Sequence, residues 1–578
     1  MSFTKIIKQI ANNKLLILYI SPFIIYLLVA YLLYGPAHFT DIHRDIFTPS
    51  GDPLASVWYL RWWPFSIAHG LNPIMEKFAY YPNRFDLAWS TSIFTLAIFM
   101  APITAIWGAL TSFNVLALLA LPITALCCYY LIFYLTKKYW TSVLCGFIYG
   151  FSSFQLAELL GHDCFYVSFI PPLVVLMVLM RLKDRLGRIP FIIILGVLLA
   201  MQFGIATEGY GSLYLFGGGA WVLTYIFADK KLRPKLLKAT VDIVLASVLG
   251  LIILTPFIYY LIKGYSGVPA VVNSPLGYSA DLLNYIIPTK ITFIGGNLFA
   301  NVSKNFTGNA SEQGAYLGVP LILFIVGYGI FNWRKWYTKV LVILAGLIAL
   351  ASLGPKLQIN GKIESLSLPW TIATHLPVLR SMLPTRFPMY IFLVASIMLG
   401  LWLSNKPKAT KKKQRKAKLI QASKYSLVIV IIIMLLPATS NYFWAPPNLP
   451  SLFTPKLTKQ YIGLNNNVLI LPLNDGADPE FWQVSSDMEF KTTDGYLGFV
   501  PNFVINSGIT VEVSSDMPGP GFVPDFLGFL KANDVSEIVY TPAGLPQTVK
   551  IVKIINSLNW TTLNVGGATI IKVPPIYQ

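Results

Sequence analysis

The chain has 578 residues, of which 55% are hydrophobic and only 12% are charged, and its mean hydropathy is +0.61. A soluble domain carries about 25% charged residues, so this composition excludes an ordinary soluble protein and predicts a polytopic membrane protein. The net charge of +19 would suit a nucleic-acid partner in a soluble chain. In a membrane protein the same excess indicates basic cytoplasmic loops, and we expect no nucleic-acid binding.

Eleven apolar stretches predict membrane-spanning helices. The first has no small-residue cleavage site, so we interpret it as a retained helix rather than a signal peptide. The expected spans cover residues 15–34, 113–135, 141–160, 165–181, 189–206, 211–228, 239–262, 316–332, 339–353, 387–404 and 425–441.

The basic residues predict how these spans are oriented. If the N-terminus is cytoplasmic, the short cytoplasmic segments hold 26 of the 44 Lys and Arg residues but only two acids, Asp184 and Asp229. We therefore expect a multi-pass protein of the cell membrane. The basic segment 406–418 is cytoplasmic in this topology, where it serves as an orientation signal or binds anionic lipid.

The apolar stretch 91–109 must not cross the membrane once, because a single crossing would invert every later loop. Pro102 interrupts this stretch near its middle. We expect a re-entrant or interfacial element on the outer side, with a true crossing as the alternative.

The composition changes from about residue 445. Residues 468–473, 536–541 and 568–573 read as strands, and 523–534 reads as an amphipathic helix. We therefore predict a transmembrane domain over 1–444, with a large first outer loop at 35–112, and a small extracytoplasmic α/β domain over 445–578.

Unusual polar residues gather on the predicted outer face. Acids on several outer loops and arginines on the last one indicate one outward-facing cavity, and the planar fork of arginine suits a phosphate group. The candidates are Asp41, Asp45, Asp52, Trp58, Arg61, Trp62 and Trp63 in the first loop, Glu158, His162 and Asp163 after the third span, then Glu208, Asp281, Glu312, Lys356, Arg380 and Arg386.

Several stretches, in this order, resemble the GT-C membrane glycosyltransferases, in particular a bacterial group that includes YfhO-like proteins. The stretches are "GDPLASVWYLRWWPFSIAHGLNP…YYPNR", "GHD" after the third span, "YSADLLNYIIPT", "AYLG" and "SLGPKLQINGK…LPW…LPVLRSMLPTRF". The likeness covers the whole length of the chain.

The resemblance implies transfer of a hexosyl or pentosyl unit from a polyprenyl-phosphate-linked donor to a glycan, lipid or protein acceptor on the outer face. An acid of the first outer loop then serves as general base or orients the acceptor. Asp52 matches that acid by position. Many relatives have two adjacent acids there, whereas Asp52 stands alone before Pro53, so Asp45 or Asp41 is an alternative.

Elementary chemistry assigns the other roles. Inverting transfer to a hydroxyl needs a carboxylate within reach of the acceptor proton, and the departing lipid phosphate needs fixed cations. Arg380 and Arg386 are expected to supply these cations, with Lys356 as a helper. Asp163 is a further candidate acid.

We expect the remaining candidates to line the substrate cavity. They are His162, Glu208, Trp58, Arg61, Trp62, Asp281 and Glu312.

Most of these residues also have a structural alternative. Asp52 suits a helix N-cap, His162 and Asp163 suit a capped helix end, Arg386 and Arg380 suit pairing with acids or lipid headgroups, and the tryptophans suit a membrane-interface belt that includes contact with headgroups.

We predict no cofactor and no metal. Two His/Asp ligands do not make a metal site, the other histidines have no matching spacing, and the four cysteines, which fall within or at the ends of apolar runs, read as small buried hydrophobes. A divalent ion is possible in principle, but the ligand spacing does not support one.

Two other classes of function stay open at this stage. A transporter or flippase of lipid-linked or anionic substrates would place charges inside the spans, where this chain has almost none. A non-catalytic assembly factor with an inherited cavity is the other alternative.

Overall fold

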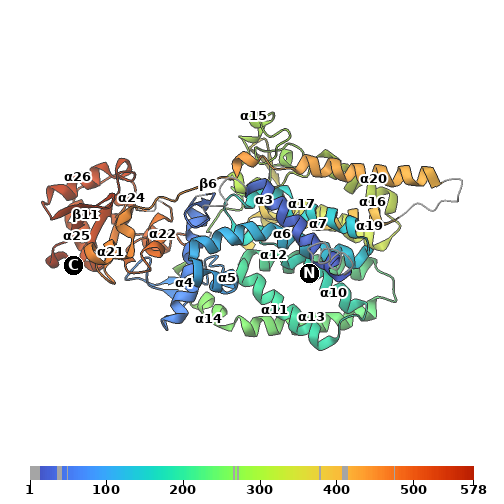
Figure 1. Cartoon of the computed structure of the whole chain (residues 1–578), viewed down its shortest axis with the longest axis horizontal. Helices are drawn as coiled ribbons and strands as arrows, with labels where there is room; N and C mark the ends of the chain where they lie inside the picture. The colour runs from blue at the N-terminus through green and yellow to red at the C-terminus, as the bar shows by residue number, and fades with distance from the viewer. Residues whose placement is uncertain are drawn as a thin grey trace, which may run out of the picture. The chain divides into compact units, whose positions relative to one another are not determined.

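The computed structural model describes residues 14–35, 42–48, 50–264, 267–269, 272–376, 379–405, 414–473 and 476–578. Asp41 and most of the basic segment, 406–413, lie outside these residues. The chain divides into two compact units (Figure 1). The first holds residues 1–39, 115–253 and 273–443, and the second holds 40–114, 254–272 and 444–578. The second unit thus combines the predicted C-terminal domain with the predicted first outer loop.

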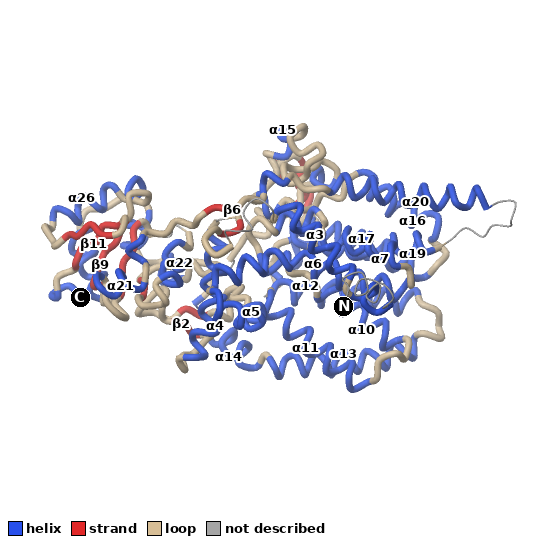
Figure 2. Tube along the Cα trace, in the orientation of Figure 1, coloured by secondary structure: helices blue, strands red, loops and turns tan. Residues whose placement is uncertain are grey.

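The first unit is mainly helical, with loops and two short strands between some of its helices (Figure 2). Each of the eleven predicted spans overlaps at least one helix, so the expected helical architecture is confirmed. The longer helices are α3 (Ser21–Tyr34), α6 (Ala109–Thr136, most of it in this unit), α7 (Tyr139–Gly150), α10 (Ile170–Leu182), α11 (Arg188–Ile205), α12 (Thr207–Phe227), α13 (Arg233–Ile253), α16 (Val319–Asn332), α17 (Trp336–Ser352), α19 (Pro388–Ser404) and α20 (Gln414–Leu435).

Short elements connect these helices. They are α2 (Lys14–Tyr19), α8 (Ser153–Glu158), α9 (Asp163–Tyr166), α15 (Ala300–Ser303), α18 (Trp370–Ala373), the strands β4 (Lys356–Ile359) and β5 (Lys362–Ser367), and the 3-10 turns η3 (Leu282–Tyr285), η4 (Ala310–Glu312), η5 (Leu379–Ser381), η6 (Pro384–Arg386) and η8 (Thr439–Asn441).

Six helical stretches among the described residues are long and apolar enough to cross a membrane. They coincide with the second, fourth, fifth, seventh, tenth and eleventh predicted spans. Shorter apolar helices stand at the first, eighth and ninth predicted spans. The chain is therefore a multi-pass membrane protein, and its orientation stays a prediction.

Proline marks where many of these helices begin. It occupies the first turn of α3, α10, α16 and α19, where its missing N–H breaks no helical hydrogen bond and its fixed φ suits the helix. The predicted span 239–262 is divided for the same reason. Helix α13 ends at Ile253, and Pro256 lies in the first turn of α14 (Thr255–Lys263), which belongs to the second unit.

The stretch 91–109 forms helix α5 (Phe94–Trp107) in the second unit. It packs against α4 (Gly51–Ala68), with the Phe94 and Trp63 ring centroids 5.6 Å apart. A helix of 14 residues is about 21 Å long, shorter than the ~30 Å hydrocarbon core. The interfacial interpretation of this element stays a prediction.

The C-terminal part of the second unit folds around a five-stranded mixed sheet in the order β10-β11-β9-β7-β8. The predicted strands are present as β7 (Asn467–Leu471), β9 (Val535–Tyr540) and β11 (Ala568–Lys572). Strand β7 pairs in parallel with β8 (Lys491–Thr492) and β9. Strand β11 pairs antiparallel with β9 and β10 (Thr562–Val565).

Helices cover this sheet with periodic apolar faces. The predicted amphipathic helix is α25 (Phe522–Ala532), which buries Phe522, Phe526 and Leu530, four residues apart. Burying each such side chain contributes about 1.5–3 kcal/mol. The other elements of the unit are β1 (Ile46–Phe47), β2 (Met75–Glu76), β3 (Phe85–Asp86), β6 (Trp444–Ala445), η9 (Ser451–Phe453), α21 (Pro455–Tyr461), α22 (Asp478–Ser485), α23 (Asn502–Ile505), α24 (Gly508–Ser514), η10 (Leu545–Gln547), α26 (Val549–Ser557) and η11 (Pro575–Tyr577).

Candidate active site

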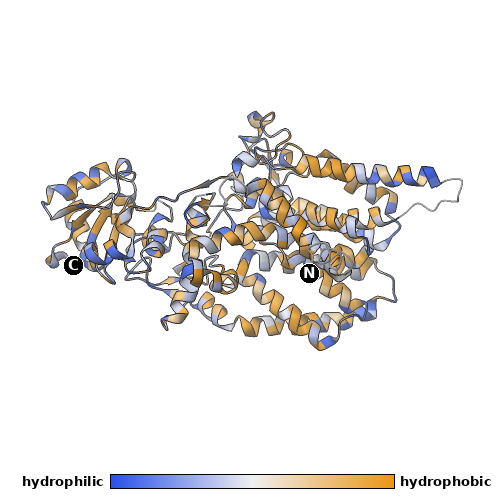
Figure 3. Cartoon of the chain, in the orientation of Figure 1, coloured by the Kyte–Doolittle hydropathy of each residue, from blue (hydrophilic) through white to orange (hydrophobic). Residues whose placement is uncertain are grey.

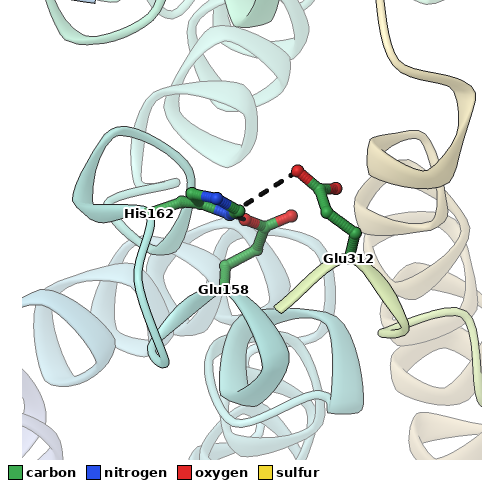
Figure 4. A group of neighbouring side chains, drawn as sticks. All are labelled: Glu158, His162 and Glu312. Atoms are coloured by element: carbon green, nitrogen blue, oxygen red, sulfur yellow. Dashed lines mark hydrogen bonds and ion pairs between the residues drawn. The ribbon is translucent and has the colours of Figure 1, made fainter. Parts of the chain in front are cut away.

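In the first unit, five polar side chains from separate segments meet in one buried cluster. Glu158 ends α8, His162 precedes α9, Glu208 lies in the first turn of α12, Glu312 ends η4 and Arg386 ends η6. Figure 4 shows three of them, with the carboxylates of Glu158 and Glu312 both turned towards the His162 ring. We call these five residues the acid–arginine cluster.

Arg386 is the centre of this cluster. Its Nη1 donates to Glu208 Oε2 at 2.6 Å, and its Nη2 and Nε donate to Glu312 Oε1 at 2.5 and 3.1 Å. The guanidinium carbon lies 4.0 Å from the centroid of the Phe165 ring, a cation–π contact. Charge-assisted bonds of this kind are the strong ones, and here they hold the planar fork between two carboxylates.

His162 joins the remaining two acids. Its Nδ1 lies 2.7 Å from Glu158 Oε2 and 3.6 Å from Glu312 Oε1. Glu158 and His162 stand four residues apart, a spacing that brings side chains together on a helical turn. Glu158 was predicted to lie on the outer face without a role of its own, although its spacing from His162 was a signal that the two side chains meet.

The local chain conformation presents Glu312 to the cluster. The Asn309 side chain caps η4 by accepting from the Glu312 N–H at 3.1 Å. Gly314 then passes so close to α8 that a Cβ there would lie 2.7 Å from the Phe154 Cα. Only glycine allows this approach. The Thr385 hydroxyl donates to the Glu312 carbonyl and joins η6 to the same turn.

The acid–arginine cluster is unbalanced in charge. With all three carboxylates ionised, Arg386 and a protonated His162 leave an excess of one negative charge. Buried charges without partners are costly, so the cluster has the chemistry to take up a proton or a cation. Ligand atoms of Glu158, His162 and Glu312 all lie within 4.8 Å of one another, and these three residues could hold a metal ion. The sequence prediction of no metal stays a prediction.

The other predicted residues of the first unit lie outside this cluster. Asp281 caps η3, where its Oδ1 accepts from the Leu283 N–H at 2.9 Å and its Oδ2 from the Gly361 N–H at 2.7 Å. Backbone amides thus donate to both of its carboxylate oxygens, and its predicted place in the substrate cavity stays a prediction. Asp163 is buried and accepts from the Cys164 N–H at 3.0 Å.

The two remaining predicted cations lie in other elements. Arg380 is half-buried in η5, and Lys356 is exposed at the start of β4. Arg386 is also half-buried, with a side-chain exposure of 14%. Of the expected trio of phosphate-binding cations, Arg386 is the one paired with the acids of this cluster, and Lys356 is exposed.

In the second unit, Asp52 lies in the first turn of α4, after the N-cap residue Ser50. The helix N-terminus stabilises a negative charge at this position. The Tyr496 hydroxyl donates to Asp52 Oδ1 at 2.9 Å. Asp52 is half-buried, so its carboxylate is fixed and still partly accessible.

Tyr496 is itself held by a buried acid. Glu480 Oε1 accepts from the Tyr496 N–H at 2.8 Å, and burial raises the pKa of Glu480 well above its ordinary value. Tyr496 therefore connects α22 of the C-terminal region to the first turn of α4. Tyr496 was not predicted as a site residue, because nothing in its spacing relates it to Asp52.

Asp45, the alternative acid, lies just before β1. Its carbonyl oxygen accepts from the Asn114 side-chain amide at 2.7 Å, and the Phe47 N–H donates to Asn114 Oδ1 at 3.1 Å. Asn114 thus fixes the chain around Asp45, which is half-buried.

Trp58 and Trp62 do not have the exposed faces that stacking on a sugar or a lipid headgroup requires. Their exposed fractions are 0% and 1%, and their rings stack on each other at 5.1 Å. The Trp58 indole N–H donates to Gln483 Oε1 at 2.8 Å, and that of Trp62 donates to the Pro73 carbonyl at 2.9 Å. Both side chains are part of the packed interior. Arg61, on the same helix, forms an ion pair with Asp487.

A pocket of about 440 Å³ opens within the second unit, a size typical of small-ligand sites. Its lining includes Arg84, Asp86, Tyr260, Lys263 and Phe503. Arg84 and Lys263 are exposed, and no described acid pairs with either of them. Burial raises the pKa of Asp86 to about 6. The pocket therefore combines aromatic walls with two available cations.

No protein-family model and no curated protein sequence matches the chain. Among solved structures, the arabinofuranosyltransferase AftD from Mycobacteria is similar, with a TM-score of 0.54 at 11% identity over 96% of this chain. The chain spans 39% of the AftD chain. The likeness covers both units and shows the architecture. The chain has the GT-C fold.

Two other GT-C glycosyltransferases match over most of the chain. The archaeal oligosaccharyltransferase AglB from Archaeoglobus fulgidus, solved with an inhibitory peptide and a dolichol-phosphate, has a TM-score of 0.49 at 13% identity, over 96% of this chain and 75% of its own. ArnT from Cupriavidus metallidurans, bound to undecaprenyl phosphate, has a TM-score of 0.46 at 10% identity, over 97% of this chain and 98% of its own.

Proposed function

We propose that this chain is a membrane glycosyltransferase that moves a sugar, with inversion, from a polyprenyl-phosphate-linked donor to an acceptor on the outer face of the cell membrane. The observation that carries the proposal is the GT-C fold, which the chain shares with an arabinofuranosyltransferase. The whole-length resemblance of the loop motifs supports it independently.

Asp52 is the proposed general base or acceptor-orienting group. An inverting transfer needs a carboxylate close to the acceptor hydroxyl, and Asp52 is half-buried and accepts a hydrogen bond from the Tyr496 hydroxyl. Asp45 and Asp163 are the alternative acids. Removal of a general base typically slows a reaction about 10²–10⁴-fold.

The donor phosphate has two possible sets of cations. Arg386 can bind it only by exchanging a carboxylate, because Glu208 and Glu312 occupy its fork, so in the first unit Arg380 and Lys356 carry most of the predicted role. Arg84 and Lys263 in the pocket of the second unit are the other set. We propose that one of these two pairs binds the phosphate oxygens.

We propose that transfer needs no metal ion. The guanidinium of Arg386 already lies between Glu208 and Glu312, where it partly balances their charge. EDTA should therefore leave the rate of transfer unchanged. If EDTA abolished transfer and Mn²⁺ or Zn²⁺ restored it, the group Glu158, His162 and Glu312 would have to be assigned to an ion instead.

The central experiment uses the full chain with undecaprenyl-phosphate-linked pentose and hexose donors, and mass spectrometry to follow release of undecaprenyl phosphate. Asp52→Asn should reduce release to background while the protein elutes as a folded monodisperse species. The matched control is Asp525→Asn, because Asp525 also lies in the first turn of a helix of the second unit and is exposed. Normal release by Asp52→Asn would reject this residue as the base.

A second experiment separates the two cation pairs. The double variants Arg84→Gln/Lys263→Gln and Arg380→Gln/Lys356→Gln are compared for binding of undecaprenyl phosphate. Loss of binding in one double variant and not in the other identifies the pair. If neither variant changes binding, both assignments fail. If the purified protein moves lipid-linked sugar across vesicles without releasing the carrier, the transporter alternative replaces the enzyme.

A further inference from the structure

An unusually apolar segment is exposed in the first unit, directly before α15. Its sequence is "FIGGNLF", residues 293–299. Phe293 is 73% exposed, Leu298 81% and Phe299 39%. Single exposed apolar side chains are ordinary, but several large ones within one turn of chain indicate a surface that contacts something apolar.

The backbone beneath these side chains is firmly held. Thr289, Ile291 and Thr292 are buried. Gly295 has φ +82°, and a Cβ at Gly296 would lie 2.5 Å from the Thr292 carbonyl oxygen, so both glycines are needed for the turn. The Phe299 N–H then donates to the Gly295 carbonyl at 3.0 Å. The segment is a built turn that points apolar side chains outward.

The same segment is hydrogen-bonded to the chain that leaves helix α20. The Phe293 N–H donates to the Leu436 carbonyl at 2.8 Å, and the Ala438 N–H donates to the Ile291 carbonyl at 2.7 Å. Thr292 and Pro437 form an antiparallel bridge. Figure 1 shows α15 and the chain around it beside this end of α20. The turn is therefore fixed at the level where α20 ends.

Helix α20 is one of the helices long and apolar enough to cross a membrane, and only 17% of its most apolar window is buried. Ile429, Val430 and Ile433, in its last turns, are 40–50% exposed, and Figure 3 shows the helix as hydrophobic towards this end. In a spanning helix such side chains face lipid. The exposed apolar surface of α20 thus continues into the turn at 293–299.

We propose that residues 293–299 form an interfacial anchor that inserts Phe293, Leu298 and Phe299 into the bilayer leaflet at the Leu435 end of α20. In the predicted topology this is the outer leaflet. Lys290 and Lys304 are exposed on either side of the segment, where they can reach lipid phosphates while the apolar side chains enter the acyl region. The anchor would exist whether or not the chain transfers sugars.

Lipid is favoured over a protein partner because the segment continues the exposed apolar surface of α20. The segment adjoins a helix surface that needs lipid in any case, and it is flanked by cations rather than by the polar rim that surrounds a protein interface. The expected depth is shallow, because the buried threonines and the glycine turn keep the backbone hydrogen-bonded at the helix end.

The test is site-directed spin labelling of the full chain in vesicles of phosphatidylethanolamine and phosphatidylglycerol. Leu298→Cys carries the label, and Asn301→Cys, which is exposed three residues further on in α15, is the matched control. Cys164→Ser removes the half-buried native thiol, whereas the other three cysteines are buried. Accessibility is measured to oxygen, which enters lipid, and to a nickel chelate, which stays in water.

The ratio of oxygen to nickel accessibility should be several-fold higher at residue 298 than at residue 301. Equal ratios at both positions would place the segment in water and overturn the anchor. Low accessibility to both reagents with spin–spin broadening would instead show that a second copy of the chain covers it, which also overturns the anchor. If Leu298→Cys does not fold, Phe293→Cys carries the same expectation.

Discussion

Glu208 and Glu312 in the first unit share one arginine, whereas Asp52 in the second unit accepts a hydrogen bond from the Tyr496 hydroxyl. The first arrangement consists of buried charges that depend on each other, so removal of one member leaves the others unpaired. The second is a half-buried carboxylate beside a hydroxyl. We therefore expect the acid–arginine cluster to contribute more to the stability of the first unit than Asp52 contributes to that of the second, in line with the role proposed for Asp52.

The largest loss of stability is expected for Arg386→Gln. Loss of the guanidinium leaves Glu208 and Glu312 buried without their cation, which costs about 3–5 kcal/mol. The variant should show a large drop in the denaturant or thermal midpoint of the full chain in detergent. Lys362→Gln, an exposed cation of β5, should stay within about 0.5 kcal/mol of the wild type. A normal midpoint for Arg386→Gln would show that the cluster is not structural.

The second unit has its own source of stability, which lies away from Asp52. Leu530 is fully buried in the core beneath the sheet. Leu530→Ala should therefore destabilise the second unit by about 2–5 kcal/mol through lost burial and a cavity. Limited proteolysis should show faster cleavage within 444–578. If the cleavage pattern is unchanged, the packing of α25 does not determine the stability of this unit.

Tyr496→Phe tests how much the hydrogen bond to Asp52 contributes to the stability of the second unit. The variant keeps the ring but removes the hydroxyl that donates to Asp52. Because a hydrogen bond to a charged group contributes about 1.5–3 kcal/mol when buried and Asp52 is half-buried, we expect a loss of about 1.5 kcal/mol at most. The thermal midpoint should fall much less than in Arg386→Gln. An equally large fall would erase the difference between the two units.

A pH dependence of stability is also expected in the second unit. Burial raises the pKa of Glu76 to about 8, although the Phe78 and Ala79 N–H groups donate to its carboxylate. Glu76 therefore keeps its proton in the folded chain at a pH where the unfolded chain has lost it. Its contribution to stability is complete below the ordinary pKa of 4.5 and is lost as the pH rises to about 8.

Glu76→Gln should remove this slope, which is about 1.4 kcal/mol per pH unit for one proton. Free energies of unfolding measured between pH 5 and pH 8 should then vary less in the variant than in the wild type, by about that slope. An unchanged slope would mean that Glu76 is ionised in the folded chain.

Much of the fold was predictable from the sequence. Apolar run length predicts helices at all eleven positions, and alternating apolar residues predict β7, β9 and β11. The distribution of lysine and arginine predicts how the helices are oriented. The points where a helix breaks within a predicted span were harder to predict. Ser21-Pro22 and Thr255-Pro256 begin new helices within predicted spans, and a run-length argument counts residues without asking where a proline prevents continuation. Strand β10 was missed, although Gly566 and Gly567, both with positive φ, form a hairpin turn after it.

The candidate site was predictable only in part. Sequence analysis named Glu208, Glu312, His162 and Arg386 as residues of one outer cavity, and these four lie together with Glu158. Pairing of Arg386 with acids was predicted as the alternative to phosphate binding, but the sequence could not show which acids it pairs with, because pairing between distant loops leaves no mark in spacing. The indoles of Trp58 and Trp62 show a related limit. Their clustering resembles a binding surface, but both are buried in the second unit.

The second unit is assembled from three separate stretches of chain, and strand β1 pairs Ile46 with Ala445 of β6. During synthesis, residues 40–114 are made long before their partners in 444–578 exist. Since the packing of this unit needs both stretches, its first part stays incomplete until residues 444–578 have been made. Assembly of the second unit is therefore a late event, and truncations anywhere after α20 should leave a membrane-inserted chain whose second unit is open to proteases.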